Sequence, residues 1–192
     1  MRLMAEVNME YLDIVDENGM PTGKTISRDE AHRDGVRHRT SHVWVIRRSA
    51  EGIDVLLQKR SMEKESYPGL YDTSSAGHIP AGDEPLPSAL RELREELGVA
   101  AGPGQLRFAG IFRTRYEKTF HGRLFRDNEV SWVYVYDAPV DISALTLQAS
   151  EVDEVRWFDL ETVWREIQTD RRRFCVPAGG LRVLRNHLGL PV

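Results

Sequence analysis

The chain has 192 residues and a mass of 22.0 kDa, a length that suits one domain with a substantial core. Its formal net charge is −4 with the charges interspersed, so neither a nucleic-acid partner nor a membrane-surface helix is expected. The chain has no apolar run near the roughly 18 residues that a membrane-spanning helix needs, and the segment MRLMAEVNME carries acids where a signal peptide is apolar. Cys175 is the only cysteine, which fits a reducing compartment. We therefore expect a cytoplasmic protein.

The first predicted elements form an N-terminal β-hairpin that precedes the core. Tyr11 to Val15 alternates as a strand does, Asp16 to Gly19 reads as a turn, and Thr22 to Ile26 can pair back on the first strand. Ser27 and Glu30 have the spacing of a capping box, which predicts that a helix begins there.

The rest of the chain alternates between predicted strands and predicted helices. The strand candidates are rich in β-branched and aromatic residues, and they are His42 to Arg47, Asp54 to Gln58, Leu106 to Thr114, Val130 to Tyr136 and Val155 to Phe158. The helix candidates are Leu86 to Leu97, Leu160 to Thr169, and a last one from Ala178 or Leu181 to Leu188. Strands on both sides of a helix, with further helices later, indicate an α/β fold in which a mixed β-sheet is sandwiched between α-helices.

The most informative segment is GHIPAGDEPLPSALRELREELGV, residues 77–99. Its helix ends at Gly98 and places Glu92, Glu95 and Glu96 at i, i+3 and i+4, within one arc about 100° wide. Like charges at this spacing destabilise a helix slightly, so either the face is simply solvated or a cation binds there. Oxygen ligands favour a hard cation such as Mg²⁺ or Mn²⁺.

This segment resembles the Nudix box, G-x(5)-E-x(7)-R-E-U-x-E-E-x-G-U with U aliphatic. The matching residues are Gly77, Arg91, Glu92, Leu93, Glu95, Glu96, Gly98 and Val99. The one departure is Asp83, which stands where the family has a glutamate that braces the box arginine. The length predicts a single domain for residues 1–192, and the resemblance implies a Nudix core at about residues 38–173. The resemblance also implies an Mg²⁺-dependent hydrolase that cleaves the P–O–P linkage of a small-molecule diphosphate, either a nucleoside diphosphate derivative or an isoprenoid diphosphate.

Within that family, the chain resembles the branch of type I isopentenyl-diphosphate isomerases and their hydrolytic relatives. In those isomerases, three histidines and two carboxylates build a second metal site. The corresponding residues here are His32, His38, His78, Asp127 and Glu129, with the two carboxylates expected in a loop just before a strand. A carboxylate of the box or Glu129 is the expected base that takes the proton of the attacking water.

The same resemblance points to residues that contact the substrate. Arg60 and Lys64 stand where the isomerases place diphosphate-binding cations, and Arg91 and His78 are the other expected substrate contacts. The position of the isomerase acid/base cysteine is Ala76 here, so hydrolysis is favoured over isomerisation. An isomerase-like enzyme and a non-catalytic nucleotide-binding regulator remain the alternatives.

Two tryptophans on predicted strands are candidates either for substrate contact or for the core. Trp44 and Trp132 could stack on a base or an isoprenoid tail, although a tryptophan on a strand more often packs in the core.

Overall fold

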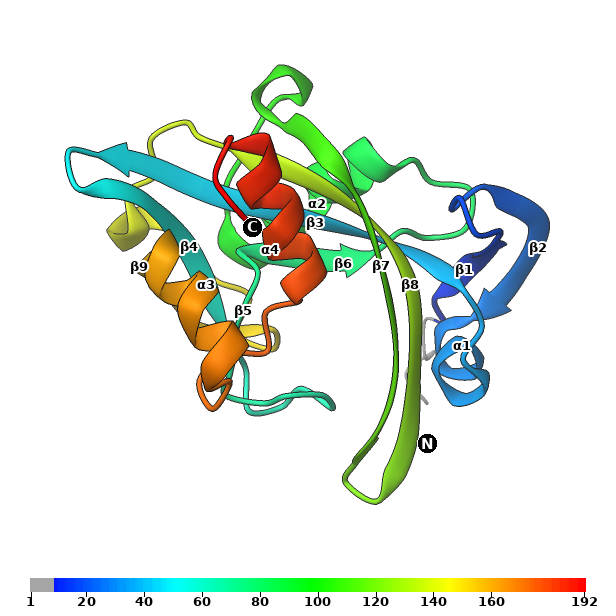
Figure 1. Cartoon of the computed structure of the whole chain (residues 1–192). Helices are drawn as coiled ribbons and strands as arrows, with labels where there is room; N and C mark the ends of the chain where they lie inside the picture. Colours follow the sequence, from blue (N-terminus) through cyan, green and yellow to red (C-terminus); the bar gives the residue numbers. More distant parts are fainter. Residues whose placement is uncertain (1–8) are drawn as a thin grey trace, which may run out of the picture.

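The structure of the protein is a computed structural model that describes residues 9–192. The first eight residues of the acidic N-terminal segment lie outside the described residues. The chain forms a seven-stranded mixed sheet between helices and a separate two-stranded sheet near the N-terminus (Figure 1). This architecture confirms the expected α/β fold and the N-terminal hairpin.

The large sheet has the strand order β5-β4-β3-β8-β7, with β6 paired to the first half of β3 and β9 paired to β4. Its strands are β3 (His38–Ser49), β4 (Gly52–Arg60), β5 (Tyr71–Asp72), β6 (Ser75–His78), β7 (Arg107–Phe120), β8 (Arg123–Tyr136) and β9 (Val152–Asp159). β3 and β8 run parallel, whereas every other neighbouring pair runs antiparallel. The parallel pair therefore joins strands from distant parts of the chain at the middle of the sheet.

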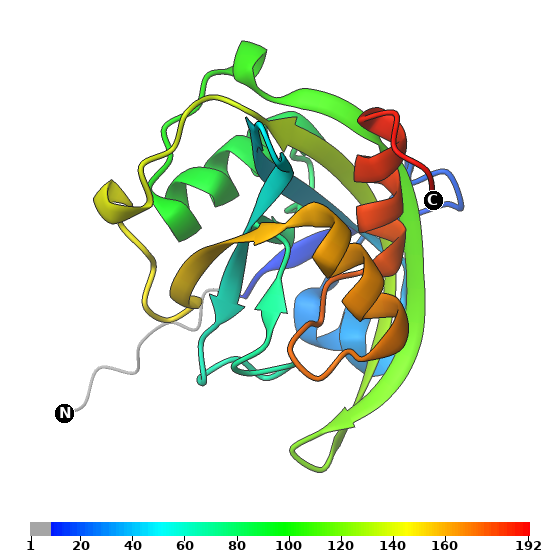
Figure 2. The ribbon, with the colours of Figure 1, turned by 60° about the vertical axis from the view of Figure 1, so that its left-hand side comes forward.

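Helices cover both faces of this sheet. They are α1 (Arg28–Asp34), α2 (Pro85–Leu97), α3 (Leu160–Thr169) and α4 (Ala178–His187), with two short 3₁₀ turns at Pro103–Gln105 and Ile142–Ala144. Seen from the side, α2 lies on one face and α3 and α4 lie on the other (Figure 2). No helix in residues 9–192 has the length and apolar character needed to cross a membrane.

Strand alternation divides the core into two layers. On β3, Trp44 and Ile46 pack with the residues of α3 and α4, whereas Val43 and Val45 pack with Leu93 and the other apolar residues of α2. Trp44 is completely buried, so the core interpretation of this residue is correct. Successive side chains of β3 therefore alternate between the face covered by α3 and α4 and the face covered by α2.

The N-terminal hairpin of β1 (Tyr11–Val15) and β2 (Pro21–Ser27) is fastened to the loop that begins the box. The Ala81 N–H donates to the Tyr11 carbonyl at 2.8 Å. The Asp13 carboxylate accepts from Arg39 at 2.8 Å and from the Gly82 N–H at 3.0 Å, and both charged side chains are buried. The hairpin thus stabilises the box loop.

Some predicted boundaries were wrong. β3 begins at His38, four residues before the predicted start, and β8 begins at Arg123. Asp127 and Glu129 therefore lie within a strand and not in a loop before it. The reason is that polar and charged residues fill most positions of these strand segments, so they lack the apolar alternation by which a strand is recognised. β5 and β6 were missed because they are too short to show a period.

Candidate active site

Three imidazoles and two carboxylates meet on one face of the sheet. We call His32, His38, His78, Asp127 and Glu129 the histidine–carboxylate cluster. The Nε2 atoms of His32 and His78 are 3.1 Å apart, and Glu129 Oε1 lies 3.7 Å from His38 Nε2 and 3.9 Å from His78 Nε2. His32 Nδ1 lies 3.9 Å from Asp127 Oδ1. The structure therefore brings together all five residues that the resemblance implied.

Strand register explains this convergence. In the parallel β3–β8 pair, His38 lies opposite Glu129, and in the antiparallel β3–β6 pair, His78 lies opposite Thr40. Because side chains alternate along a strand, these residues point to the same face. His32 reaches them from α1, whose first turn is capped by the Ser27 hydroxyl, as predicted.

The protonation states of the cluster suit a divalent cation. Burial lowers the pKa of His32 to about 4, with a smaller effect of His38, and burial holds the pKa of His78 well below its usual value. Burial and then the charge of Glu129 raise the pKa of Asp127. For Glu129, burial opposes ionisation, but the nearby imidazoles, led by His38, outweigh it and lower the pKa. Neutral His32 and His78 and ionised Glu129 are in the forms that bind metals, whereas Asp127 must release its proton to become a ligand.

Unpaired polar atoms in the cluster are an independent indication that it binds a cation. Within residues 9–192, His32 Nδ1, His38 Nε2 and Asp127 Oδ1 are buried without a hydrogen-bond partner. One possible ligand atom from each of the three histidines lies within 4.8 Å of the others, and the same holds for His38, Asp127 and Glu129. Buried polar groups normally have partners, so the cluster fits a bound cation.

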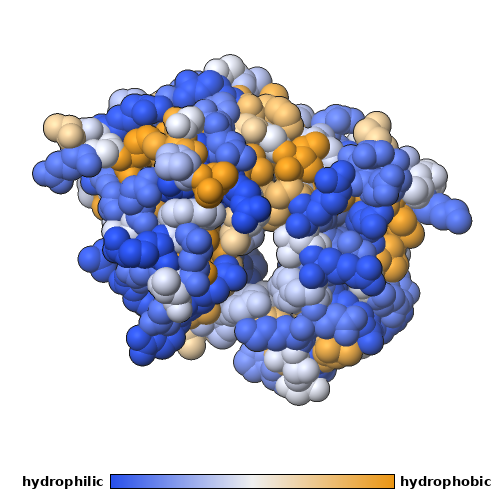
Figure 3. Space-filling model, in the orientation of Figure 1, coloured by the Kyte–Doolittle hydropathy of each residue, from blue (hydrophilic) through white to orange (hydrophobic). Residues whose placement is uncertain are grey.

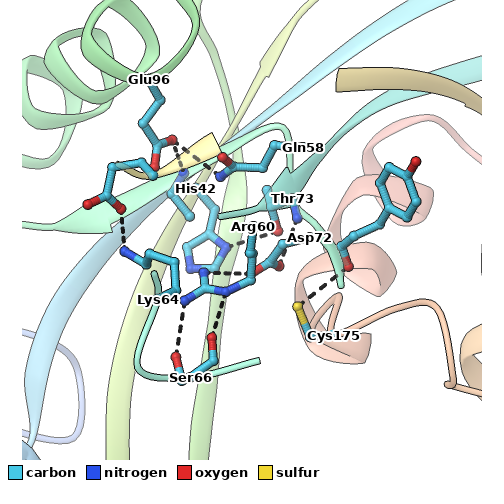
Figure 4. Close-up of polar contacts among 12 residues, drawn as sticks. His42, Gln58, Arg60, Lys64, Ser66, Asp72, Thr73, Glu96 and Cys175 are labelled. Carbon is cyan, nitrogen blue, oxygen red and sulfur yellow. Dashed lines mark hydrogen bonds and ion pairs between the residues drawn. The ribbon is translucent and has the colours of Figure 1, made fainter. Parts of the chain in front are cut away.

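The three glutamates of α2 differ in their surroundings. Glu96 is buried and accepts from the Ala76 N–H at 3.1 Å and from Gln58 Nε2 at 3.4 Å (Figure 4). Burial raises the pKa of Glu96 to about 8, and the charge of Glu92 acts in the same direction. Glu92 lies against Gly77 of β6, whereas Glu95 is exposed to solvent. Glu92 and Glu96 thus converge on the short strand β6.

The Arg91 guanidinium donates hydrogen bonds to three protein groups. It donates to Glu92 at 2.8 Å, to Asp83 at 3.2 Å and to the His78 carbonyl at 3.3 Å. The shorter Asp83 side chain therefore still reaches the box arginine. In this arrangement Arg91 links the box loop, α2 and β6.

The two cations expected at the substrate also have protein partners (Figure 4). Arg60 donates to the Ser66 carbonyl at 2.9 Å, to the Ser66 hydroxyl at 3.1 Å and to Asp72 at 3.3 Å. Lys64 forms an ion pair with Glu151. Both side chains stabilise the loop that follows β4, and contact with a substrate phosphate would require them to exchange these partners.

Sequence reasoning missed an aromatic wall beside the cluster. Phe125 stacks on His32 with ring centroids 4.3 Å apart, and Phe120 lies between Phe125 and Tyr67, at 5.8 Å and 4.9 Å. Tyr116 pairs with Asp127 across the β7–β8 hairpin. The signal was available, since these residues alternate along the two strands. Figure 3 shows the surface hollowed near its lower centre, where Figure 1 places the β7–β8 hairpin beside the loop after β4.

His42 on β3 is a further buried histidine of this region, and it was not assigned a role from the sequence. It lies opposite Ala76 in the β3–β6 pair, and its Nδ1 is 3.5 Å from the Thr73 hydroxyl. Burial lowers its pKa. The only cysteine, Cys175, instead donates to the Tyr71 carbonyl at 3.5 Å (Figure 4). No thiol therefore faces His42 at the Ala76 position.

Comparison with known proteins agrees with this geometry. The family model described as the NUDIX domain matches residues 36–177, which include the box and most of the histidine–carboxylate cluster. The chain belongs to the Nudix family.

Two curated relatives and one solved structure illustrate the range of Nudix proteins that it resembles. Nudix hydrolase 3 of Arabidopsis thaliana is 42% identical over 79% of this chain, but the match spans only 19% of the plant protein. An isopentenyl-diphosphate Delta-isomerase of Cereibacter sphaeroides is 33% identical over 78% of both chains. The crystal structure of DR0079 from Deinococcus radiodurans has a TM-score of 0.66 at 20% identity and covers 92% of this chain and 98% of its own, which shows the shared fold.

Proposed function

We propose that this Nudix protein is an Mg²⁺-dependent hydrolase that cleaves the P–O–P linkage of a small-molecule diphosphate. The observation that carries the proposal is the convergence of Glu92 and Glu96 on β6, with the exposed Glu95 on the same helix. A buried carboxylate such as Glu96 is costly unless it is protonated or paired with a cation. Family membership supports the same chemistry, since the box is intact apart from Asp83.

The side chains divide the work in the following way. Glu92, Glu95 and Glu96 would hold Mg²⁺ or Mn²⁺, and the histidine–carboxylate cluster would hold a second cation. A bound cation neutralises phosphate charge and lowers the pKa of a coordinated water. Glu129 or a box glutamate takes the proton of the attacking water. Arg60 and Lys64 would bind the phosphates after leaving their present partners, and Arg91 holds Glu92 in place while His78 faces the substrate.

The substrate is either a nucleoside diphosphate derivative or an isoprenoid diphosphate. The wall formed by Tyr67, Phe120 and Phe125 suits a flat or apolar group beside the cation sites. The single cysteine favours a reducing compartment, and we propose the cytoplasm as the site of action.

Isomerisation is the second candidate, because isomerases of similar length are 33% identical to this chain. It would require an acid/base group near the substrate carbon, and Ala76 has none. A regulator that only binds nucleotides is disfavoured because the box glutamates Glu92, Glu95 and Glu96 are all present.

One substrate panel separates these functions. The purified protein is incubated with nucleoside diphosphate sugars, dinucleotides, oxidised nucleotides and isopentenyl diphosphate, with Mg²⁺ or with EDTA. We expect metal-dependent cleavage of at least one compound by the wild type and none by Glu92→Gln, which removes a ligand charge while keeping its shape. Double-bond isomerisation of isopentenyl diphosphate would overturn the proposal in favour of the isomerase, and metal-independent cleavage would overturn the cation assignment.

A further inference from the structure

A second hollow lies on the opposite face of the sheet from the histidine–carboxylate cluster. Arg39 and Trp132 contribute to it, and they follow the alternation opposite to that of His38 and Glu129 on the same strands. The hollow has a volume of about 460 Å³ and lies among the turn of the N-terminal hairpin, the start of α2 and strands β7 and β8. This volume falls in the range of roughly 300–1,000 Å³ that small-molecule sites occupy.

The walls of the hollow are aromatic. Phe108 and Tyr134 meet edge to face, with ring centroids 5.8 Å apart and an interplanar angle of 61°. Phe108 is 53% exposed although it lines a concave surface. Trp132 is fixed from behind by the hairpin turn, because a Cβ added at Gly19 would collide with the indole ring. These rings are positioned to stack on a flat ligand.

One buried polar atom of the hollow lacks a partner. Arg39 is only 5% exposed, and its Nη2 donates to Asp13 at 2.8 Å and to the Asp83 carbonyl at 2.9 Å. Its Nε–H is buried and has no hydrogen-bond partner among residues 9–192. Arg39 also lines the hollow, so its guanidinium places positive charge and hydrogen-bonding capacity beside it.

An acceptor lies at the rim of the same hollow. Glu84 is the N-cap residue of α2, yet its exposed side chain makes no capping hydrogen bond. Glu84 and Tyr134 both line the hollow, and burial and then the charge of Glu84 raise the pKa of Tyr134 to about 12. The hollow therefore combines a guanidinium donor, a free acceptor and aromatic faces.

We propose that this hollow is a nucleobase site separate from the hydrolytic centre. The base would stack on Phe108 and Trp132, accept a hydrogen bond from the Arg39 guanidinium and donate its N–H groups to Glu84. A guanine ring matches this set best, because it carries a carbonyl acceptor beside two N–H donors that one carboxylate can accept together. The inference does not depend on the proposed hydrolysis, since it uses none of the residues assigned to that reaction.

Binding of guanosine to the full chain tests the proposal. Guanosine lacks phosphate and EDTA removes divalent cations, so isothermal titration calorimetry under these conditions reports on base recognition and not on the diphosphate site. We expect saturable binding in the micromolar to millimolar range. Glu84→Gln and Phe108→Ala change exposed side chains, so both variants should fold, and each should weaken binding about tenfold through a lost charge-assisted bond or lost stacking.

Two controls keep their affinity if the proposal is correct. Asp153→Asn removes an exposed carboxylate outside the hollow, and Glu92→Gln alters the hydrolytic centre on α2. Absence of guanosine binding overturns the proposal. Equal binding by the wild type, Glu84→Gln and Phe108→Ala overturns it too, as does loss of binding in Glu92→Gln, which would place the base at the hydrolytic centre. Indole is the probe for purely apolar binding, and an affinity equal to that of guanosine would contradict recognition by Arg39 and Glu84.

Discussion

At the scale of single residues, the site depends on buried polar groups that the protein leaves without a cationic or a hydrogen-bonding partner. Glu96 accepts hydrogen bonds from a backbone N–H and from Gln58, but no cationic side chain forms an ion pair with it among the described residues. The unpaired atoms of His32, His38 and Asp127 show the same condition on the neighbouring strands. These residues are therefore where cation binding and stability should be linked most strongly.

Glu96 should make the metal-free protein less stable as the pH rises. Its pKa is about 8 in the folded chain against an ordinary value of 4.5, so the folded state binds the proton more tightly than the unfolded state does. The stabilisation is complete below pH 4.5 and is lost as the pH rises through 8, by on the order of 5 kcal/mol. Thermal unfolding in EDTA between pH 5 and 9 should show a steeper decline for the wild type than for Glu96→Gln. Glu95→Gln, at an exposed position, should decline as the wild type does, and parallel profiles for all three proteins would contradict the interpretation.

His78 should affect how much metal the protein binds. If the histidine–carboxylate cluster holds a second cation, His78→Ala removes one of its ligands and should lower both metal stoichiometry and turnover. Metal content by mass spectrometry of the folded variant measures the first effect. His121→Ala, at the turn of the β7–β8 hairpin, is a matched control that should keep its metal. An unchanged metal count in His78→Ala would leave that residue a structural or phosphate-binding role.

At the scale of elements, the short strand β6 and helix α2 together form the proposed hydrolytic centre. β6 donates a backbone N–H to Glu96, carries His78 and passes close to Glu92 at Gly77. Such a close approach leaves no room for a side chain at Gly77. The box requires a glycine at position 77 because the Glu92 carboxylate packs directly against its Cα.

Gly77→Ala should therefore reduce activity strongly while the fold persists. The added methyl group would collide with the Glu92 carboxylate and displace it from the cation site. We expect a fall in kcat/KM of at least about 100-fold, because a displacement near 1 Å can have that effect on a catalytic group. Gly104→Ala is the control, since a Cβ there meets no atom within 4 Å. Activity of Gly77→Ala within a fewfold of the wild type would show that Glu92 is not required in its present position.

The sequence predicted the elements that have a regular period and the site residues that lie in a local motif. Residues 86–97 were recognised as a helix because their apolar stripe and terminal glycine are local signals. Asp127 and Glu129 were assigned by resemblance but placed in a loop, since no local pattern shows that polar residues on β8 pair beside β3. The partners of Arg60 and Lys64 and the hollow around Trp132 arise from contacts between distant segments, which one sequence does not reveal.

At the scale of the whole molecule, buried polar contacts connect the N-terminal hairpin to the Nudix core. The buried Asp13–Arg39 pair connects the hairpin, β3 and the box loop. We therefore propose that residues 1–192 form a single domain, and we expect unfolding curves from circular dichroism and tryptophan fluorescence to coincide.

Asp13→Ala should shift both of those curves together. It leaves Arg39 buried without its carboxylate, which should cost about 3–5 kcal/mol. Asp54→Ala, which breaks the more exposed pair with Arg47, should cost less than about 1 kcal/mol. Chemical denaturation measures both effects. Separate transitions for the two probes, or equal shifts for the two variants, would contradict a single unit held by the buried pair.

The parallel pairing of β3 with β8 also has a consequence for how the chain folds. His38 and Glu129 are neighbours only because strands separated by most of the core lie side by side in register. Contacts between such distant segments carry a high loop-closure entropy and form slowly. The hairpin of β7 and β8 and the pair of β3 and β4 can form earlier, but neither alone assembles the histidine–carboxylate cluster. Uptake of a cation by this cluster would therefore report, during refolding, the moment at which the two halves of the sheet join.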